Sequence, residues 1–166
     1  MKKYLLIIFL FFCDRCFAQI TFIKEYPIGN VSGIGYSIDT TSDNNFILSG
    51  QSFYPRPTLM KLNSLGNILW AKHYELSSSG NIKAHQTYDG GYILSGGGIN
   101  SRFGLAKTDS IGSVLWEKSY QASSYDLFFD LKQTNDSGFI LCGTTGTPFV
   151  DLDLYIVKTN SIGDTL

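Results

Sequence analysis

The sequence predicts an all-β protein made of about three repeated units, each with four antiparallel strands. Three patterns carry this prediction. An aromatic residue followed by Ile-Leu, a small residue and Gly occurs at 46–50, 92–96 and 139–143. The pattern Lys-x-x-Ser-x-Gly occurs at 61–66, 107–112 and 158–163, and Leu-Trp-x-Lys-x-Tyr occurs at 69–74 and 115–120. Because the patterns keep one order and recur at shifts of 46, 47 or 51 residues, they indicate internal repeats.

Turn signals separate the predicted strands within each unit. In the middle unit, Asp89-Gly90-Gly91 precedes the strand at 92–96, and the turn at 109–112 precedes a strand that carries Trp116. Asp and Gly favour tight turns because they tolerate positive φ or bond the nearby backbone. Both faces of the strand at 92–96 are apolar or small, which indicates a sheet packed on both sides. Four-stranded units of this length, packed face to face, are typical of β-propeller blades.

Two stretches resemble known repeat families. Residues 107–116, KTDSIGSVLW, resemble the quinoprotein-type propeller repeat, whose blades end in a Gly-x-x-x-Trp docking motif. Residues 89–96, DGGYILSG, resemble the DGGYIL-type repeats of bacterial secreted and surface proteins. The resemblance covers about residues 20–166 and implies a fold, with Trp marking the docking of one blade on the next. The chain lacks the calcium- and quinone-binding residues of the enzymes that this repeat family includes, so we expect no cofactor.

Residues 1–18 are predicted to be a signal peptide. Two lysines precede the apolar stretch 4–12, and Cys16-Phe17-Ala18 fits a small-x-small cleavage site. The stretch is too short to anchor stably in a bilayer. A lipoprotein that begins at Cys13 is the alternative, and the bulky Phe12 argues against it. We therefore expect export to the medium, the cell surface or the periplasm, with no membrane span in the mature chain.

Cleavage would leave an acidic chain with one thiol. It removes three basic residues and one acidic residue, which leaves 10 basic and 13 acidic side chains. This balance gives no basic patch for nucleic acid. Cys142 would be the remaining cysteine, so an intrachain disulfide is excluded. Because Cys142 replaces Ser49 and Ser95 in the repeat, we expect a buried inert thiol rather than a nucleophile.

The predicted propeller region runs from 19 to 166 and divides into units. Residues 20–26 match the end of a unit and are expected to form a blade-closing strand, and the three blades follow at 36–74, 82–120 and 128–166. Two prolines make 54–57 a loop, and a longer loop is expected at 144–153 in the third blade. The third blade lacks its last strand, since its aromatic residue is due at position 167. Propellers usually have about four to eight blades, so we expect either a fragment of a longer protein or self-association.

The first strand of a propeller blade normally lines the central channel. Aligning the units places three polar residues at one equivalent position: Asp39, His85 and Lys132. Three more polar residues lie two positions earlier on the same strand face: Ser37, Lys83 and Asp130. These six are the candidate channel-lining residues, and they could hold a ligand or an ion. The competing interpretation, which we favour, is a solvated channel that is simply polar.

Other candidate sites are weaker. The chain has no nucleophile motif, phosphate loop or dinucleotide fingerprint. His73 and His85 lack the spacing of a zinc site, and Asp151 and Asp153 are too few ligands for calcium. We therefore predict no catalytic, cofactor-binding or metal-binding residue.

Four aromatic residues recur at fixed positions in the units: Trp70, Tyr74, Trp116 and Tyr120. They could stack on sugars, but their recurrence favours a packing role. We expect a non-catalytic exported propeller module for binding or surface interaction, whose partner is an unidentified ligand, surface protein or glycan. The alternatives are a fragment of a propeller enzyme with its catalytic residues outside this chain, or a structural spacer of a larger surface protein.

Overall fold

A computed structural model describes residues 21–26, 33–52, 57–74, 81–97, 103–121, 125–147 and 150–166. Within these ranges the protein is all-β, with eleven strands and no helix. It follows that this part of the chain has no long apolar helix of the kind that crosses a membrane. The predicted signal peptide, 1–18, lies outside the described residues.

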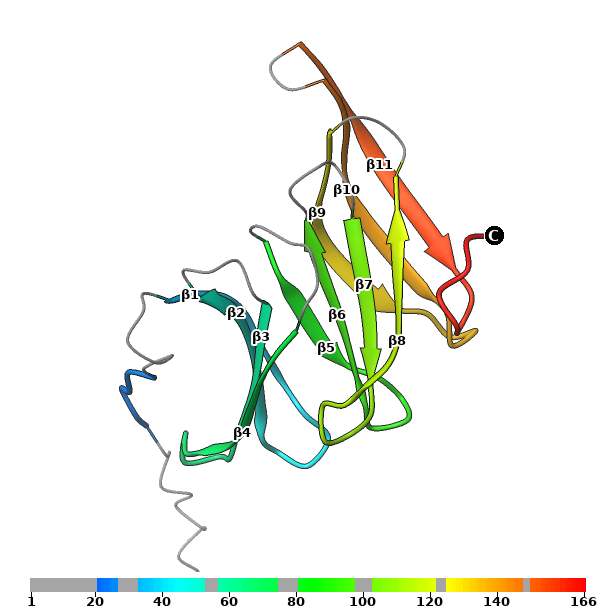
Figure 1. Ribbon diagram of the computed structural model, residues 1–166. Helices are drawn as coiled ribbons and strands as arrows, with labels where there is room; N and C mark the ends of the chain where they lie inside the picture. Colours follow the sequence, from blue (N-terminus) through cyan, green and yellow to red (C-terminus); the bar gives the residue numbers. More distant parts are fainter. Residues whose placement is uncertain are drawn as a thin grey trace, which may run out of the picture.

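The strands form three antiparallel sheets, in each of which neighbours in sequence are neighbours in space. The first sheet contains β1 (Gly33–Thr40), β2 (Phe46–Ser52), β3 (Pro57–Leu62) and β4 (Ile68–His73). The second contains β5 (Lys83–Gln86), β6 (Tyr92–Gly97), β7 (Phe103–Thr108) and β8 (Val114–Tyr120). The third contains β9 (Tyr125–Gln133), β10 (Phe139–Thr147) and β11 (Asp151–Thr159). Figure 1 shows the sheets side by side in an arc that does not close. The predicted all-β class, with antiparallel four-stranded sheets that do not close on one another, is confirmed.

Two apolar cores join the three sheets. The core between the first and second sheets includes Ile47, Leu59, Tyr92 and Leu94, all fully buried. The core between the second and third sheets includes buried Ile93, Leu105, Phe128, Phe139 and Leu141. Since Tyr92 and Leu94 face one core and Ile93 faces the other, the prediction that both faces of this strand are buried is confirmed.

Aromatic side chains dock each sheet on a glycine turn of the next sheet. Trp70 of β4 lies against Gly112, where an added Cβ would come within 3.1 Å of the indole ring. The hydroxyl of Tyr74 donates a hydrogen bond of 2.9 Å to the Gly112 carbonyl. In the same way, the hydroxyl of Tyr120 donates to the Gly163 carbonyl at 2.5 Å. Tyr74 and Tyr120 are buried, so the prediction that these aromatics serve packing is confirmed.

Residues 21–26 make the same docking contact on the first sheet. Phe22 lies against Gly66, and the hydroxyl of Tyr26 donates a 2.9 Å hydrogen bond to the Gly66 carbonyl. Lys24 Nζ donates to Asn67 Oδ1 at 2.7 Å. Lys118 contacts Asp164 in the equivalent way at 2.7 Å. Residues 21–26 form no strand, but they make the docking contacts that β4 and β8 make with the sheets that follow them.

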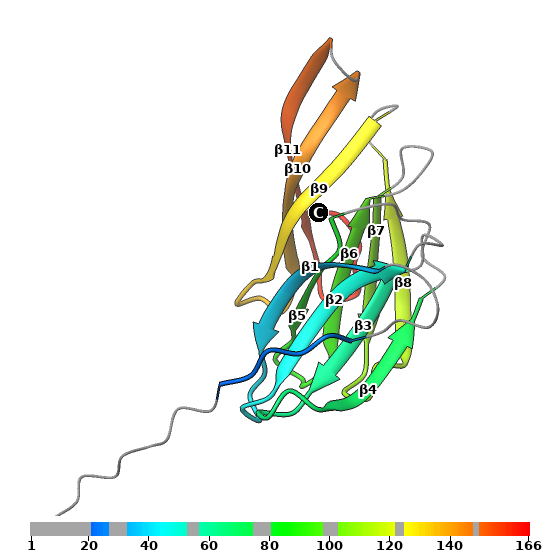
Figure 2. The ribbon, with the colours of Figure 1, turned by 90° about the vertical axis from the view of Figure 1, so that its left-hand side faces the viewer.

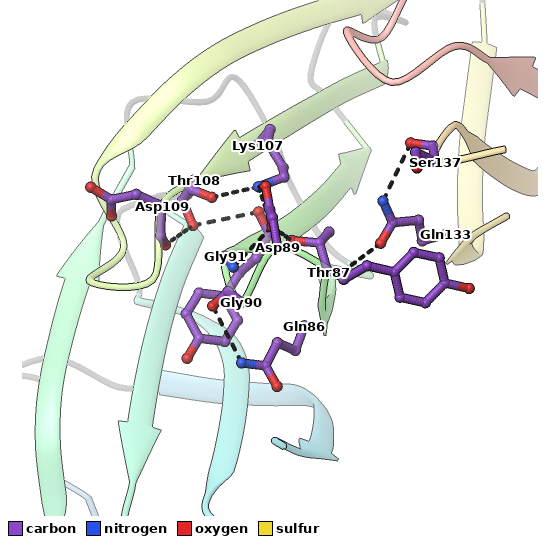
Figure 3. A network of polar contacts seen from close by, with 12 residues as sticks. Gln86, Thr87, Asp89, Gly90, Gly91, Lys107, Thr108, Asp109, Gln133 and Ser137 are labelled. Atoms are coloured by element: carbon purple, nitrogen blue, oxygen red, sulfur yellow. Dashed lines mark hydrogen bonds and ion pairs between the residues drawn. The ribbon is translucent and has the colours of Figure 1, made fainter. Parts of the chain in front are cut away.

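A polar clamp fixes the first turn of each sheet. Figure 3 shows it in the second sheet, where Thr87 donates a 2.6 Å hydrogen bond to Asp89 and Lys107 Nζ lies 2.8 Å from the same carboxylate. The Gly91 N–H also donates to Asp89, at 3.0 Å. The other two sheets repeat the clamp with Thr41, Asp43 and Lys61, and with Thr134, Asp136 and Lys158. The clamp explains why Asp and Lys recur in every unit.

The polar clamp leads us to expect that its contribution to the stability of the fold is lost at acidic pH. Burial acts to raise the pKa of Asp89, but hydrogen bonds from Lys107, Thr87 and the Gly91 N–H outweigh it and lower that pKa to about 2. A carboxylate with a depressed pKa stabilises the fold above its unfolded pKa, and this contribution is lost as the pH falls through the folded pKa. We expect Asp89→Asn to lower the urea midpoint at about pH 6 and to differ much less from wild type near pH 2. An equal loss at both pH values would contradict the assignment.

The third sheet differs from the expected loop at 144–153. β10 continues to Thr147 and β11 begins at Asp151, with Thr147 paired to Asp151 and Thr145 paired to Asp153. The extra residues therefore lengthen a hairpin instead of forming a loop. The physical reason is the alternation of apolar and polar residues in β11 and the β-branched threonines of β10, both of which favour strands.

Candidate functional site along the first strands

The first strands of the three sheets lie next to one another. β5 contacts both β1 and β9, and Figure 2 shows the three strands along one side of the molecule. Hydrogen bonds between glutamine side chains and the backbone keep these strands adjacent. Gln86 Oε1 accepts a 2.7 Å hydrogen bond from the Ser42 N–H, and Gln133 Oε1 accepts one of 2.8 Å from the Tyr88 N–H. The residues predicted to line a channel therefore come from three adjoining strands.

Three of the six predicted residues meet in a row. His85 Nδ1 lies 2.6 Å from Asp39 Oδ2, and His85 Nε2 lies 3.7 Å from Asp130 Oδ1. Nε2 is buried and has no hydrogen-bond partner in the described part of the molecule. All three side chains are partly exposed. The row thus presents two carboxylates and an imidazole at a surface that solvent reaches.

The other three predicted residues have different surroundings. Ser37 Oγ lies 2.6 Å from Ser49 Oγ and accepts a 3.2 Å hydrogen bond from the Ala84 N–H, so it helps to join the first two sheets. Lys83 Nζ donates to the Tyr36 carbonyl at 3.4 Å. Lys132 is exposed on the third sheet. Ser37 and Lys83 thus hold neighbouring strands together, while Lys132 lies on a free face.

That free face is the outer face of the third sheet, away from the second sheet. It carries Ile140 and Ile156, which are 39% and 66% exposed, and it includes a depression of about 240 Å³. The depression is lined by Asp130, Leu131, Lys132, Ile140, Leu141, Cys142 and Ile156. The repeat alignment did not identify this face as a site, because equivalent residues such as Ile47 and Ile93 are buried under the next sheet. Among the described residues no sheet packs on this face, and the repeat alignment carries no signal for that.

Cys142 corrects one sequence-based expectation. The thiol is exposed, whereas a buried thiol was predicted. Ser49 and Ser95 at the equivalent positions are fully buried because another sheet covers each of them. Within the described residues, no sheet covers the outer face of the third sheet, and Cys142 is exposed for that reason.

The described residues contain no group of three or more His, Cys, Asp or Glu side chains arranged to hold a metal ion. Asp151 and Asp153, considered above for calcium, lie in β11, opposite the threonines of β10. The row along the first strands consists of two carboxylates and one imidazole.

Comparison with known proteins gives a likeness of fold. No protein-family model matches the chain, and no curated protein matches it in sequence. The chain is similar to a solved structure of a protein of unknown function from Bacteroides caccae, with a TM-score of 0.50 and 12% sequence identity. The match covers 85% of this chain and 67% of the other. At this identity, the likeness extends to the antiparallel all-β fold and no further.

Proposed function

We propose that this chain is an exported, non-catalytic β-propeller module that binds a polar ligand, such as a surface glycan, along its first strands. The propeller part is supported by the docking contact, in which an aromatic residue and a tyrosine hydroxyl meet a glycine turn. This contact occurs three times, at Gly66, Gly112 and Gly163. It is the arrangement that the resemblance to quinoprotein-type repeats implies.

The observation that carries the binding proposal is the row Asp39–His85–Asp130. Three sheets each place one polar side chain at the same spot, with 2.6 Å and 3.7 Å between neighbours. Nε2 of His85 is itself buried, so a ligand would bind to the row through the two carboxylates, whose side chains are 38% and 52% exposed. A ligand hydroxyl that donates a hydrogen bond to Asp39 or Asp130 would fit these acceptors.

A sugar fits the chemistry of this row. Each sugar hydroxyl can donate one hydrogen bond and accept others, carboxylates accept, and an ammonium group donates. Asp39 and Asp130 supply acceptors, and Lys132 supplies a donor close to Asp130, since both line the same depression. Neither a bound metal nor a nucleophile is needed for such recognition.

The test is a glycan array probed with the wild-type chain and with His85→Ala. We expect wild type to retain a subset of glycans and His85→Ala to lose about tenfold or more in affinity, because a charge-assisted hydrogen-bond network is broken. Glu117→Ala, a change at an exposed position on β8 away from the row, is the matched control and should bind as wild type.

Two outcomes would contradict the proposal. One is a wild-type chain that retains no glycan, which would favour the structural-spacer alternative. The other is equal binding by wild type and His85→Ala. If His85→Ala fails to fold, judged by circular dichroism, Asp130→Asn provides a second variant with a smaller change in shape.

A further inference from the structure

His85 lies between two carboxylates that come from different sheets. It belongs to β5 of the second sheet, and its Nδ1 lies 2.6 Å from Asp39 Oδ2 of the first sheet. On the other side of the ring, Nε2 lies 3.7 Å from Asp130 Oδ1 of the third sheet. Nε2 is buried and has no hydrogen-bond partner in the described part of the molecule. Each nitrogen of the imidazole therefore faces an acceptor.

A neutral imidazole can satisfy only one of these two carboxylates. It carries a single N–H, and an ionised carboxylate accepts hydrogen bonds but donates none. The 2.6 Å contact with Asp39 requires that hydrogen on Nδ1, so Nε2 of neutral His85 presents a lone pair to Asp130. The separation of 3.7 Å is longer than a hydrogen bond, as expected when two acceptors face each other.

A proton on Nε2 would turn this repulsion into a hydrogen bond. Protonated imidazole donates from both nitrogens, and a hydrogen bond between two charged groups is among the strong ones in proteins. The side chain of Asp130 is 52% exposed, so it is free to rotate towards Nε2. The buried position of Nε2 excludes a larger ligand, but solvent that reaches the partly exposed ring can deliver a proton.

We propose that the row binds a proton at Nε2 of His85, and that this proton links the third sheet to the first two. Protonated His85 would donate to Asp39 and Asp130 at once, and β1, β5 and β9 would then be bridged by one side chain (Figure 2). The proposal rests on the geometry of the row alone and is independent of any glycan.

The sign of the pH dependence follows from linkage. The docked third sheet offers the protonated ring a second acceptor, whereas a third sheet that has moved away does not. Protonation of His85 therefore favours the docked state, so the link stabilises the fold at pH values below the titration of the ring and is lost as the pH rises through it. Histidine ordinarily titrates between about pH 5 and 8.

The other charged groups around His85 do not compete for this role. β2 and β6, two further strands that contact β5, carry no Asp, Glu, Lys, Arg or His. Lys83 of β5 donates to the Tyr36 carbonyl at 3.4 Å, and Lys132 of β9 lines the depression beside Asp130. Lysine side chains are ordinarily charged throughout the range in which histidine titrates. The pH-dependent event is therefore the proton on the imidazole.

The first measurement is the position of the hydrogen on the neutral ring, by nitrogen-15 NMR of a chain labelled in its histidines. The chain has two histidines, so His73→Gln leaves His85 as the labelled one. We expect the neutral His85 ring to carry its hydrogen on Nδ1. A hydrogen on Nε2 would overturn the proposal, because Nε2 would then donate without binding a proton.

The second measurement is urea unfolding followed by the fluorescence of Trp116. This indole packs on Phe139 of the third sheet, with 5.9 Å between ring centroids, so it reports on the docking of that sheet. Trp70→Phe leaves it as the one tryptophan, and Phe22 already makes the equivalent contact at Gly66. We expect an unfolding equilibrium constant about fivefold smaller at about pH 5.5 than at about pH 7.5, a modest effect because the pair is partly exposed.

The discriminating variant is Asp130→Asn. The new amide can donate to the unprotonated Nε2, so the link no longer needs a proton and the difference between the two pH values should disappear. The change keeps the shape of an exposed side chain, so folding should survive. Asp153→Asn, which neutralises an exposed carboxylate on β11 of the same sheet, is the matched control and should keep the fivefold difference.

Three results of the unfolding experiment would overturn the proton link. They are equal stability of the wild-type chain at the two pH values, a pH difference that Asp130→Asn leaves intact, and an equal loss of that difference in Asp153→Asn. The last result would show a general effect of charge on the third sheet. No glycan is present in either measurement, so these results and those of the glycan array stand or fall separately.

Discussion

Gly91→Ala is expected to lower the free energy of unfolding by about 3 kcal/mol, the upper end of the usual cost of overpacking. A Cβ at Gly91 would lie 2.2 Å from the carbonyl oxygen of Thr108 and 2.6 Å from Lys107 Nζ. The carbonyl cannot retreat easily, because Thr108 is paired with Tyr92 in the sheet. The same Cβ would push Lys107 away from Asp89 and open the polar clamp. Urea unfolding of wild type and variant at neutral pH measures the loss.

Gly90→Ala is the matched control for this prediction. Gly90 has φ of +81°, but a Cβ there would meet nothing within 4 Å. Its cost is therefore only the strain of a left-handed alanine, about 1 kcal/mol. A loss for Gly90→Ala as large as that for Gly91→Ala would show that turn conformation, and not the crowding at Thr108, makes glycine necessary here.

Trp116→Ala is expected to cost about 3 kcal/mol, in the lower part of the range for removing a large aromatic side chain from a core. The indole of Trp116 packs edge to face on Phe139, with 5.9 Å between ring centroids, and it covers Gly163 of the third sheet. Its loss would remove the apolar contact that docks β8 on the third sheet. The change in the urea midpoint measures this cost.

The neighbouring residue provides the control for Trp116. Leu115 is in the same strand and is 59% exposed, so Leu115→Ala should change stability by no more than about 0.5 kcal/mol. If the two variants are equally stable, the docking contact contributes little. The third sheet would then be held chiefly by the buried core around Phe128 and Leu131.

Most of the fold could be predicted because its signals are local and repeated. Asp89 and Gly91 define a turn, and Tyr92 and Leu94 alternate with Ile93 across a strand buried on both faces. Equivalent signals recur in the other two units, so the assignment does not depend on one unit alone. The observed second strands begin at Phe46, Tyr92 and Phe139, where the repeat predicts them.

The failures concern features that depend on context beyond one unit. A shift of 51 residues shows that the third unit is longer, but it does not show whether the extra residues form a loop or extend the β10–β11 hairpin. Burial of Cys142 was inferred from Ser49 and Ser95, yet burial depends on a neighbouring sheet. The residue at the equivalent position is therefore exposed in the third sheet.

The candidate site was predicted in part. The alignment placed Asp39 and His85 at one equivalent position, and the structure brings them within 2.6 Å. It also placed Lys132 there, yet the side chain beside His85 on the third sheet is Asp130, two residues earlier. Neighbouring sheets are staggered by different amounts, and a sequence alignment assigns equivalence without giving that stagger.

The two cores have a consequence for how the molecule opens. In an array whose sheets pack on their neighbours, stability is a sum of terms for each sheet and each interface. The second sheet takes part in both cores, whereas the first and the third each take part in one. Local unfolding should therefore begin at an outer sheet, since a less supported unit opens at a lower free energy. When the third sheet opens, Asp130 would leave the row while Asp39 and His85 stay paired, so the three-residue site would become a two-residue site.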